Sequence, residues 1–468
     1  MVKTMKWSKL LSQKRFGDTR AAAKDSGRSP FQRDYDRIVF SSAFRRMQDK
    51  TQVFPLAESD YVRTRLTHSI EASCVGRSLG RIVGAELIKK YGKELKGYTA
   101  DDFGAIVAAA TLAHDIGNPP FGHSGENAIQ DFFTGNNNGK QCMRRVSEKE
   151  YDSSADFMFF EGNAQGFRIL TTLQHSKRPW GMQLTCATLA AYMKYPREAC
   201  HEAEKLKEIK YFKKFGFFKP ERKKFEKVAS EVGLFRKNIV DNVFSWVRHP
   251  LAFLVEAADD ICYAIIDLED GVRLGCVKYN EAQRLLLSLF VSKKEKNSVV
   301  KGLKKIPFEK EKIEYLRAAA IGELINQFAA AFMIHEAEML KGNFFKSLED
   351  KIKANKALKA IKEKDKFKVY TERNAVYIEA AGFEVLDFLL NALLASAQEV
   401  AEQKKNASYR AKKILQLIPV QFKKSNEEVD EDPYTRTIQI TDYVSGMTDS
   451  FAVSMYRKIK GIALPHPG

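Results

Sequence analysis

Cysteine is scarce in this chain of 468 residues, and none of the six cysteines belongs to a CxxC pair. This scarcity excludes a disulfide framework and a zinc knuckle, and predicts reduced thiols in the cytoplasm. Proline and glycine are also few, at 13 and 27 residues, which excludes collagen-like and low-complexity chains. No apolar run reaches the roughly 20 residues that span a bilayer, and the N-terminus lacks the apolar core of a secretory signal. We therefore expect a cytoplasmic protein without a membrane segment.

The composition is that of a folded protein with a surplus of positive charge. Hydrophobic residues make up 44% of the chain and charged residues 29%, so wholesale disorder is excluded. Lysine and arginine number 77 against 59 aspartates and glutamates, which gives a net charge of +18. Such a balance favours anionic partners, such as nucleic acid or nucleotides. The alternative is a lysine-rich exterior that only faces solvent.

Helical periodicity dominates the sequence, and it predicts an all-α fold. Apolar residues recur at spacings of three and four over residues 66–87, which indicates one long amphipathic helix. Residues 103–113 are nearly all apolar and predict a buried helix, which must end before two consecutive prolines. Further helices are expected over residues 250–268 and 379–400. Residues 435–440 are the best strand candidate, and we expect a small β-hairpin there.

Two stretches differ from the rest in being rich in lysine. Residues 201–237 hold twelve Lys or Arg against six Asp or Glu, interleaved with phenylalanines, and residues 291–315 hold eight Lys against four Glu. Basic residues that alternate with aromatic ones can bind single-stranded nucleic acid. More often such a stretch forms an amphipathic helix with phenylalanines packed inward and lysines in solvent.

A few ionisable residues lie in strongly apolar surroundings. His114 and Asp115 end the apolar helix, His68 lies in the long helix, and Asp259 and Asp260 lie within another apolar helix. Burying unpaired charges is costly, and a divalent metal that binds imidazole and carboxylate groups would remove that cost. The alternative is that these residues form buried ion pairs. The same context at several positions favours the metal.

The order His68, His114-Asp115, Asp259 resembles the HD superfamily of metal-dependent phosphohydrolases. The segment Ala-His-Asp-Ile-Gly-Asn-Pro-Pro-Phe-Gly-His-Ser-Gly-Glu at 113–126 is similar to bacterial deoxyguanosine triphosphate triphosphohydrolases (dGTPases) in particular. Residues 51–55, 65–69, 161–166 and 442–449 also match that family. The similarity thus covers most of the chain, except the two lysine-rich stretches.

The resemblance implies one divalent metal per subunit, with Mn²⁺ or Mg²⁺ expected first and Fe²⁺ or Zn²⁺ as alternatives. The implied ligands are His68, His114, Asp115 and Asp259. Asp259 is chosen over Asp260 because it recurs at helical spacing with Tyr263 and Asp267, and the family uses such a face for metal, sugar and phosphate contacts.

The resemblance also implies a catalytic pair, His123 and Glu126. Ser124 can cap a helix that begins there, which would place His123 beside N–H groups that attract phosphate, and Glu126 can orient the imidazole. The implied reaction is hydrolysis of a deoxynucleoside triphosphate, dGTP or others, at the α-phosphorus. Its products are a deoxynucleoside and inorganic triphosphate.

Further residues are implied to bind the substrate. Arg65 would neutralise phosphate charge, and Tyr263 would pack against the deoxyribose and exclude a 2′-hydroxyl. The complete set expected at the substrate is Gln52, Val53, Arg65, Asn163, Tyr263, Asp267, Tyr370 and Glu379. We expect a single unit over 1–468, with the metal and catalytic core at about 28–272, an insertion at 201–237, and a C-terminal helical region at about 315–468 that completes the nucleotide pocket. The resemblance implies a homo-hexamer or another homo-oligomer, and allows single-stranded DNA or a nucleotide as an effector.

Three alternatives stay open at this point. Hydrolysis of guanosine tetraphosphate-type alarmones is disfavoured, because those enzymes have acidic residues where Asn118 and Pro119 stand here. A phosphodiesterase of the HD type would release monophosphates. A regulator that binds single-stranded nucleic acid is motivated by the charge of +18.

Overall fold

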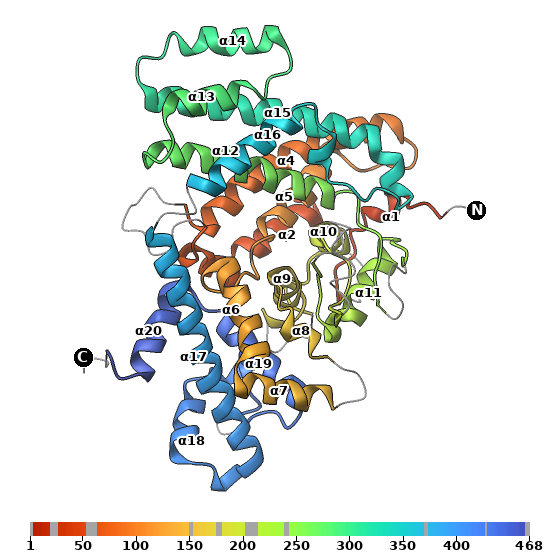
Figure 1. The fold of residues 1–468 in the computed structure, drawn as a ribbon. Coiled ribbons are helices and arrows are strands. Elements are labelled where there is room, and N and C mark those ends of the chain that lie inside the picture. The colour runs from red at the N-terminus through yellow and green to blue at the C-terminus, as the bar shows by residue number, and fades with distance from the viewer. Residues whose placement is uncertain are drawn as a thin grey trace.

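The computed structural model describes residues 3–18, 27–52, 63–148, 153–174, 180–201, 214–237, 243–368, 373–425 and 428–463. It is built almost wholly of helices, which confirms the predicted all-α class (Figure 1). Within the described residues, β-structure is limited to isolated bridges. The helices are α1 (Trp7–Leu10), α2 (Pro30–Val39), α3 (Ser42–Arg46), α4 (Arg65–Lys90), α5 (Ala100–Leu112), α6 (Gly122–Gly135), α7 (Asn137–Ser147), α8 (Ala155–Met158), α9 (Gly162–Arg168), α10 (Cys186–Tyr192), α11 (Arg222–Glu231), α12 (Ala252–Arg273), α13 (Tyr279–Leu287), α14 (Lys293–Leu303), α15 (Glu309–Leu340), α16 (Asn355–Lys368), α17 (Arg373–Gln403), α18 (Tyr409–Gln416), α19 (Pro433–Ser445) and α20 (Asp449–Ile459).

Helices α4 and α5 pack against each other at very close range. Glycines recur one turn apart on α4, at Gly76, Gly80 and Gly84. A Cβ atom at Gly80 would lie 2.7 Å from the carbonyl oxygen of Phe103, and one at Gly84 would lie 2.8 Å from the Phe103 side chain. Only glycine leaves room for this approach. The close pair brings the first turns of α4 beside the end of α5, and α12 and α15 pack onto it.

The apolar residues form two cores. One surrounds α4, α5, α12 and α15 in the upper half of Figure 1, and the other surrounds α6, α17, α19 and α20 in the lower half. The connection from α5 to α6 passes between them, because Ile116 belongs to the first core and Phe121 to the second. The residues of this connection therefore lie at the junction of the two cores.

The predicted β-hairpin at 435–440 is wrong, because these residues lie within α19. The Asp432 side chain caps this helix by accepting a hydrogen bond from the Thr435 N–H, at 2.8 Å, and Pro433 occupies the first helical position. The hydroxyl of Thr437 donates to the Pro433 carbonyl at 2.7 Å. Alternation of β-branched residues favours a strand only where neighbouring strands pair with it, and here capping and burial against α17 favour a helix.

The lysine-rich stretch 201–237 packs four of its five described phenylalanines inward, and Phe235 is partly buried. Phe215, Phe217, Phe218 and Phe225 are all at most 3% exposed, which agrees with an amphipathic segment and leaves these rings unable to stack on bases. Residues 202–213 lie outside the described residues. In the second stretch, the lysines of α14 lie exposed on a helix at the outer end of the molecule (Figure 1).

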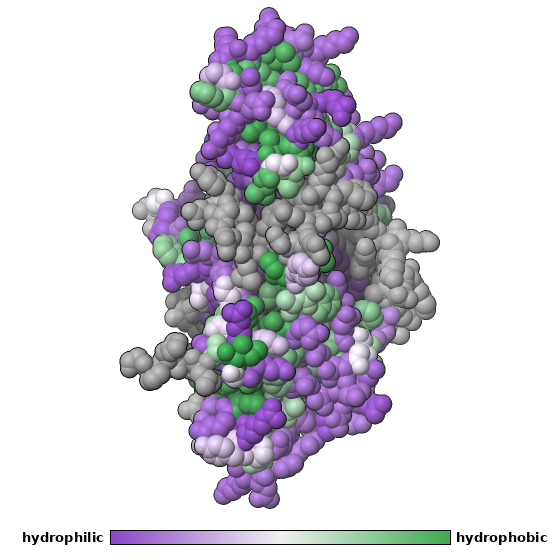
Figure 2. Space-filling model, turned by 60° about the vertical axis from the view of Figure 1, so that its left-hand side comes forward, coloured by the Kyte–Doolittle hydropathy of each residue, from purple (hydrophilic) through white to green (hydrophobic). Residues whose placement is uncertain are grey.

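Hydrophilic residues cover most of the upper and lower ends of the face in Figure 2. All six cysteines are free thiols, and three of them are buried: Cys142, Cys186 and Cys262. None of the helices in the described ranges is both long enough and apolar enough for a bilayer crossing.

Candidate metal centre and catalytic site

Three side chains from distant parts of the chain meet beside the first turn of α4. The Nε2 atom of His68 lies 3.3 Å from Oδ1 of Asp259, and the Nε2 atom of His114 lies 3.5 Å from the same oxygen. One ligand-type atom from each residue lies within 4.8 Å of the other two. Had Asp259 lain far from the histidines, the metal hypothesis would have failed, and the structure brings the three together.

The arrangement of these groups fits a divalent cation. The Nδ1 atom of His114 lies 2.6 Å from the Thr111 carbonyl oxygen, to which it donates, so Nε2 is left to face the cluster. Burial alone would lower the pKa of His114, but the carboxylates of Asp115 and Asp259 raise that pKa to about 9. This side chain thus lies where a positive charge is favoured. Two imidazoles and a carboxylate suit transition-metal ions.

Asp115 lies beside the cluster, and its oxygens already have partners. Its Oδ2 atom lies 2.6 Å from Nη1 of Arg65, and its Oδ1 atom accepts a hydrogen bond from Asn118 at 2.8 Å. The same Oδ1 lies 3.5 Å from Nε2 of His114. Burial opposes ionisation of Asp115, but His114 and Arg65 hold its pKa well below the usual range. Asp115 is therefore an anion that contacts the cluster.

The adjacent aspartates of α12 face different surroundings. Asp259 faces the histidines, whereas Oδ1 of Asp260 lies 2.7 Å from Nζ of Lys362 in α16. Asp260 also lines a cavity of about 350 Å³, together with Lys194 and Glu256. Burial raises the pKa of Asp260 to about 6.

His123 and Glu126 both lie in the first turns of α6, but they point to different neighbours. The predicted cap at Ser124 is wrong, because α6 begins at Gly122 and follows Phe121 without a side-chain cap. His123 is exposed, whereas Glu126 is buried. The Oε1 atom of Glu126 accepts the Gly162 N–H at 2.7 Å. Among the described residues, no hydrogen bond joins Glu126 to His123, because the first-turn N–H of α9 attracts the carboxylate.

Cationic groups surround His123. The guanidinium of Arg65 lies over the start of α6, where a Cβ atom at Gly122 would be 2.4 Å from Nη2. The Nε atom of Arg65 is buried and has no hydrogen-bond partner. Desolvation by the surrounding protein, followed by the charges of Lys214 and Arg65, lowers the pKa of His123. These surroundings favour an anionic ligand next to a neutral imidazole.

Sequence reasoning missed two lysines at this site. The Nζ atom of Lys214 lies 3.0 Å from Oε1 of Glu161 and 3.8 Å from Oε2 of Glu126. The Nζ atom of Lys194 lies 3.6 Å from Oε1 of Glu256. Burial alone would lower the pKa of Lys194, but nearby anionic groups that include Asp259 raise it. No periodicity marks either lysine in a chain with so many, and Lys214 lies in the stretch that matched no family segment.

The other predicted substrate residues come from several segments of the chain. Gln52 is partly buried, with its Oε1 atom unpartnered, and the Asn163 side chain donates to Glu161 at 2.7 Å. Tyr263 and Asp267 lie one and two turns after Asp259 on α12, and Glu379 lies half-buried on α17. Val53 and Tyr370 lie outside the described residues.

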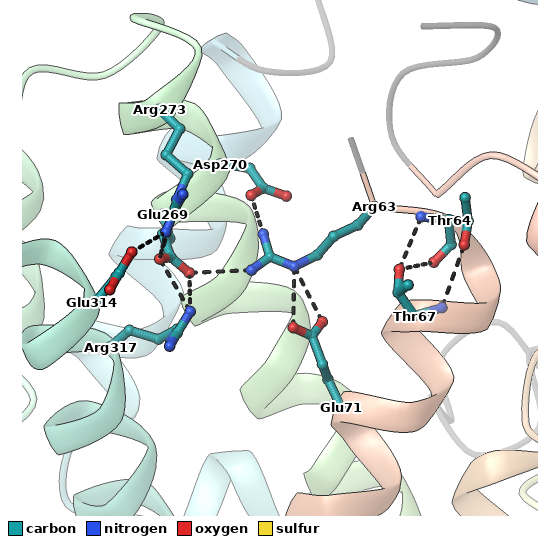
Figure 3. Close-up of polar contacts among 9 residues, drawn as sticks. All are labelled: Arg63, Thr64, Thr67, Glu71, Glu269, Asp270, Arg273, Glu314 and Arg317. Atoms are coloured by element: carbon teal, nitrogen blue, oxygen red, sulfur yellow. Dashed lines mark hydrogen bonds and ion pairs between the residues drawn. The ribbon is translucent and has the colours of Figure 1, made fainter. Parts of the chain in front are cut away.

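A network of ion pairs ties α4 to α12, the helices that carry His68 and Asp259. Arg63 precedes α4 and contacts Glu71 on α4 and both Glu269 and Asp270 on α12 (Figure 3). Glu269 is fully buried and also pairs with Arg273 and Arg317. Because Arg317 belongs to α15, the network holds three helices together.

Comparisons with known proteins agree with this geometry. An HD domain matches residues 65–213, and a phosphohydrolase-associated domain matches residues 349–458. A deoxyguanosinetriphosphate triphosphohydrolase-like protein of Synechocystis sp. is 44% identical over 98% of this chain and 100% of its own length. The chain belongs to the dGTPase family. A like-named Pseudomonas aeruginosa protein is 38% identical over 98% of this chain and 100% of its own length. A deoxyguanosinetriphosphate triphosphohydrolase of Klebsiella pneumoniae is 32% identical over 92% of this chain and 94% of its own length.

This member of the dGTPase family is therefore a phosphohydrolase of the HD superfamily. The HD match begins at the first residue of α4 and includes His68, His114 and His123. Asp259 lies beyond its end, so α12 contributes the third residue of the cluster.

Proposed function

We propose that the protein hydrolyses deoxynucleoside triphosphates, with dGTP as the first candidate, at the α-phosphorus. The products would be a deoxynucleoside and inorganic triphosphate. The observation that carries the proposal is the cluster of His68, His114 and Asp259 next to the cation-lined His123. The printed name of the Klebsiella pneumoniae relative supports the choice of dGTP.

The cluster residues, with Asp115 as a proposed fourth ligand, would hold one divalent cation. Mn²⁺ or Mg²⁺ is proposed, with Fe²⁺ or Zn²⁺ as alternatives. When bound, such a cation supplies Lewis acidity towards a phosphate oxygen and lowers the pKa of water.

The remaining roles belong to the side chains of this chain. Arg65, Lys194 and Lys214 would bind phosphate oxygens, and the unpartnered Nε of Arg65 offers a donor for that purpose. His123 would transfer a proton at the α-phosphate, and its lowered pKa keeps the imidazole able to accept one at neutral pH. Glu126, bound to the start of α9, would help to hold Lys214 near the phosphates.

Selection of the deoxyribose is proposed to depend on α12. Tyr263 would pack against the sugar where a ribose carries its 2′-hydroxyl, and Asp267 would contact the sugar from the next turn. The other residues proposed at the sugar and base are Gln52, Val53, Asn163, Tyr370 and Glu379. The unpartnered Oε1 of Gln52 is an acceptor that a substrate hydroxyl or amine can satisfy.

We further propose a cytoplasmic homo-hexamer or other homo-oligomer, with single-stranded DNA or a nucleotide as an effector. These proposals are supported by the family and by the free thiols.

The decisive experiment incubates the purified full chain with each of the four dNTPs and Mn²⁺ or Mg²⁺, and separates the products by ion-exchange chromatography. We expect equal amounts of deoxynucleoside and triphosphate. Release of a deoxynucleoside monophosphate with pyrophosphate would instead indicate cleavage between the α- and β-phosphates and would contradict the proposal. As a control, His123→Ala should lose turnover and keep its metal content.

A further inference from the structure

The C-terminal segment 442–449 matches the family but has no role in the proposed reaction. Two of its carboxylates are buried, with Asp442 2% and Asp449 1% exposed. Asp442 accepts hydrogen bonds from Arg168 at 2.8 Å and from Gln165 at 2.9 Å, both on α9. This end of the segment therefore holds the helix whose first N–H binds Glu126.

Asp449 holds two other parts of the site at once. Its Oδ2 atom accepts hydrogen bonds from the backbone N–H and the hydroxyl of Thr51, at 3.0 and 2.7 Å. Its Oδ1 atom accepts the backbone N–H of Phe121 at 3.0 Å. Thr51 precedes Gln52, and Phe121 lies two residues before His123. One buried carboxylate thus joins the predicted substrate segment to the start of α6.

Lys50 makes a parallel connection through its buried amine, whose pKa burial lowers to about 7. Its side chain is buried, and its Nζ atom donates to the carbonyl of Asn118 and, at 3.1 Å, to the carbonyl of Ser445 at the end of α19. Asn118 belongs to the connection between α5 and α6 and donates to Asp115. The amine therefore holds this connection against the second core.

The backbone at Phe121 shows why such anchors are needed. Phe121 has φ +62°, in the left-handed region that side chains other than glycine rarely adopt. Its ring packs so closely on α17 that a Cβ atom at Gly382 would lie 2.8 Å from it. A residue in an unfavourable conformation persists only where its surroundings hold it, and the bond to Asp449 is part of that support.

We propose that Asp449, together with Lys50, is a positioning residue that fixes the 118–121 turn and thereby the place of His123. The proposal rests on the proposed function for its kinetic readout. Asparagine at 449 would have one oxygen for two sets of donors, and its NH₂ group would face an N–H or O–H donor. We therefore expect Asp449→Asn to loosen the turn without removing a group that contacts substrate.

The test compares Asp449→Asn with Asp432→Asn in the full chain. Asp432 makes the same pair of bonds to a threonine N–H and hydroxyl, both 2.8 Å, at the start of α19. We expect Asp449→Asn to lower kcat for dGTP about 10- to 100-fold, with little change in KM or in Mn²⁺ affinity, because His123 is misplaced. Asp432→Asn should leave kcat near that of the wild type. Hydrogen exchange should quicken over 116–126 only in the 449 variant.

An unchanged kcat and unchanged exchange in Asp449→Asn would overturn the proposal, as would equal effects of the two variants. If Asp449→Asn does not fold, Thr51→Val, which removes one donor to the same oxygen, should show a smaller change of the same kind, and its absence would also overturn the proposal. If the wild type turns over no dNTP, the proposed function fails, and hydrogen exchange at 116–126 still decides the positioning role.

Discussion

Replacing Asp156 by asparagine should stabilise the protein above neutral pH. Asp156 is fully buried next to the second core. Its Oδ2 atom accepts hydrogen bonds from the Tyr434 hydroxyl at 2.7 Å and from the Lys219 N–H at 3.0 Å, whereas its Oδ1 atom has no partner. Burial raises the pKa of this carboxyl from 3.8 to about 7. The folded protein therefore holds the proton more tightly than the unfolded chain does.

The sign and size of the effect follow from this difference. The stability contributed by the protonated carboxyl is fully present below pH 3.8 and is lost as the pH rises through about 7. One pKa unit corresponds to about 1.4 kcal/mol, so the loss between pH 5 and pH 8 is about 3 kcal/mol. In Asp156→Asn, the amide oxygen can keep both hydrogen bonds and no charge is buried. The stability advantage of the variant over the wild type should thus grow by about 3 kcal/mol across this range.

Thermal unfolding at pH 5 and pH 8 measures this advantage. Asp432→Asn is the control, since it removes a partly buried carboxylate that caps α19, and its effect should be similar at both pH values. An Asp156→Asn variant that is less stable than the wild type at pH 8, or whose advantage is independent of pH, would refute the reasoning.

Three further results are expected. His114→Ala should abolish turnover and lower the bound metal measured by elemental analysis, with unchanged helix content by circular dichroism; wild-type activity would contradict the assigned cluster. Lys214→Met should raise KM for dGTP about 10- to 100-fold, since a hydrogen bond to a charged group contributes about 1.5–3 kcal/mol, whereas Lys224→Met, which removes a lysine paired with Glu221, should leave KM unchanged. His249 is buried, with Nε2 3.0 Å from the Leu10 carbonyl oxygen, and burial lowers its pKa from 6.5 to about 4. The stability present above pH 6.5 is therefore lost as the pH falls through about 4, by about 3 kcal/mol, and urea unfolding of His249→Asn should not show this part of the loss.

The sequence was sufficient to predict features that depend on the residue types within one segment. The buried helices are readable because apolar side chains recur at helical spacing, as in α5 and α17. His68, His114 and Asp259 could be named because their order resembles that of the HD superfamily, while the apolar surroundings of His114 and Asp259 indicated buried ionisable groups. The close approach of α4 and α5 had a sequence signal in the glycines at every fourth residue, which periodicity of apolar residues alone does not reveal.

The predictions that failed concern residues whose contacts are made with segments distant in sequence. A hairpin at 435–440 was plausible from local propensity, but packing against α17 and the Asp432 cap favour the helix. Ser124 is a suitable residue type for a helix cap, so the local sequence favoured it. The helix begins earlier because Phe121 has a left-handed backbone conformation, which depends on support from the second core and has no local sequence signal. Glu126 was expected to orient His123, yet the start of α9 competes for its carboxylate.

The second core bears on the proposed chemistry, although the cluster of His68, His114 and Asp259 lies among helices of the first core. The cluster residues must offer nitrogen or oxygen atoms that can bind a metal. Ligand chemistry therefore limits which residue types can stand at these positions, wherever they lie in the chain. The role proposed for His123 depends on its position rather than on a set of ligands. In our proposal that position is fixed by backbone groups at Asn118 and Phe121, whose partners are Lys50 and Asp449. Lys50 also binds the carbonyl of Ser445. A buried polar group that binds backbone groups is stable only if its partners stay in position, because burying it without a hydrogen bond costs several kcal/mol. These anchors thus couple the folding of the C-terminal region to the position of His123, for which we propose a catalytic role.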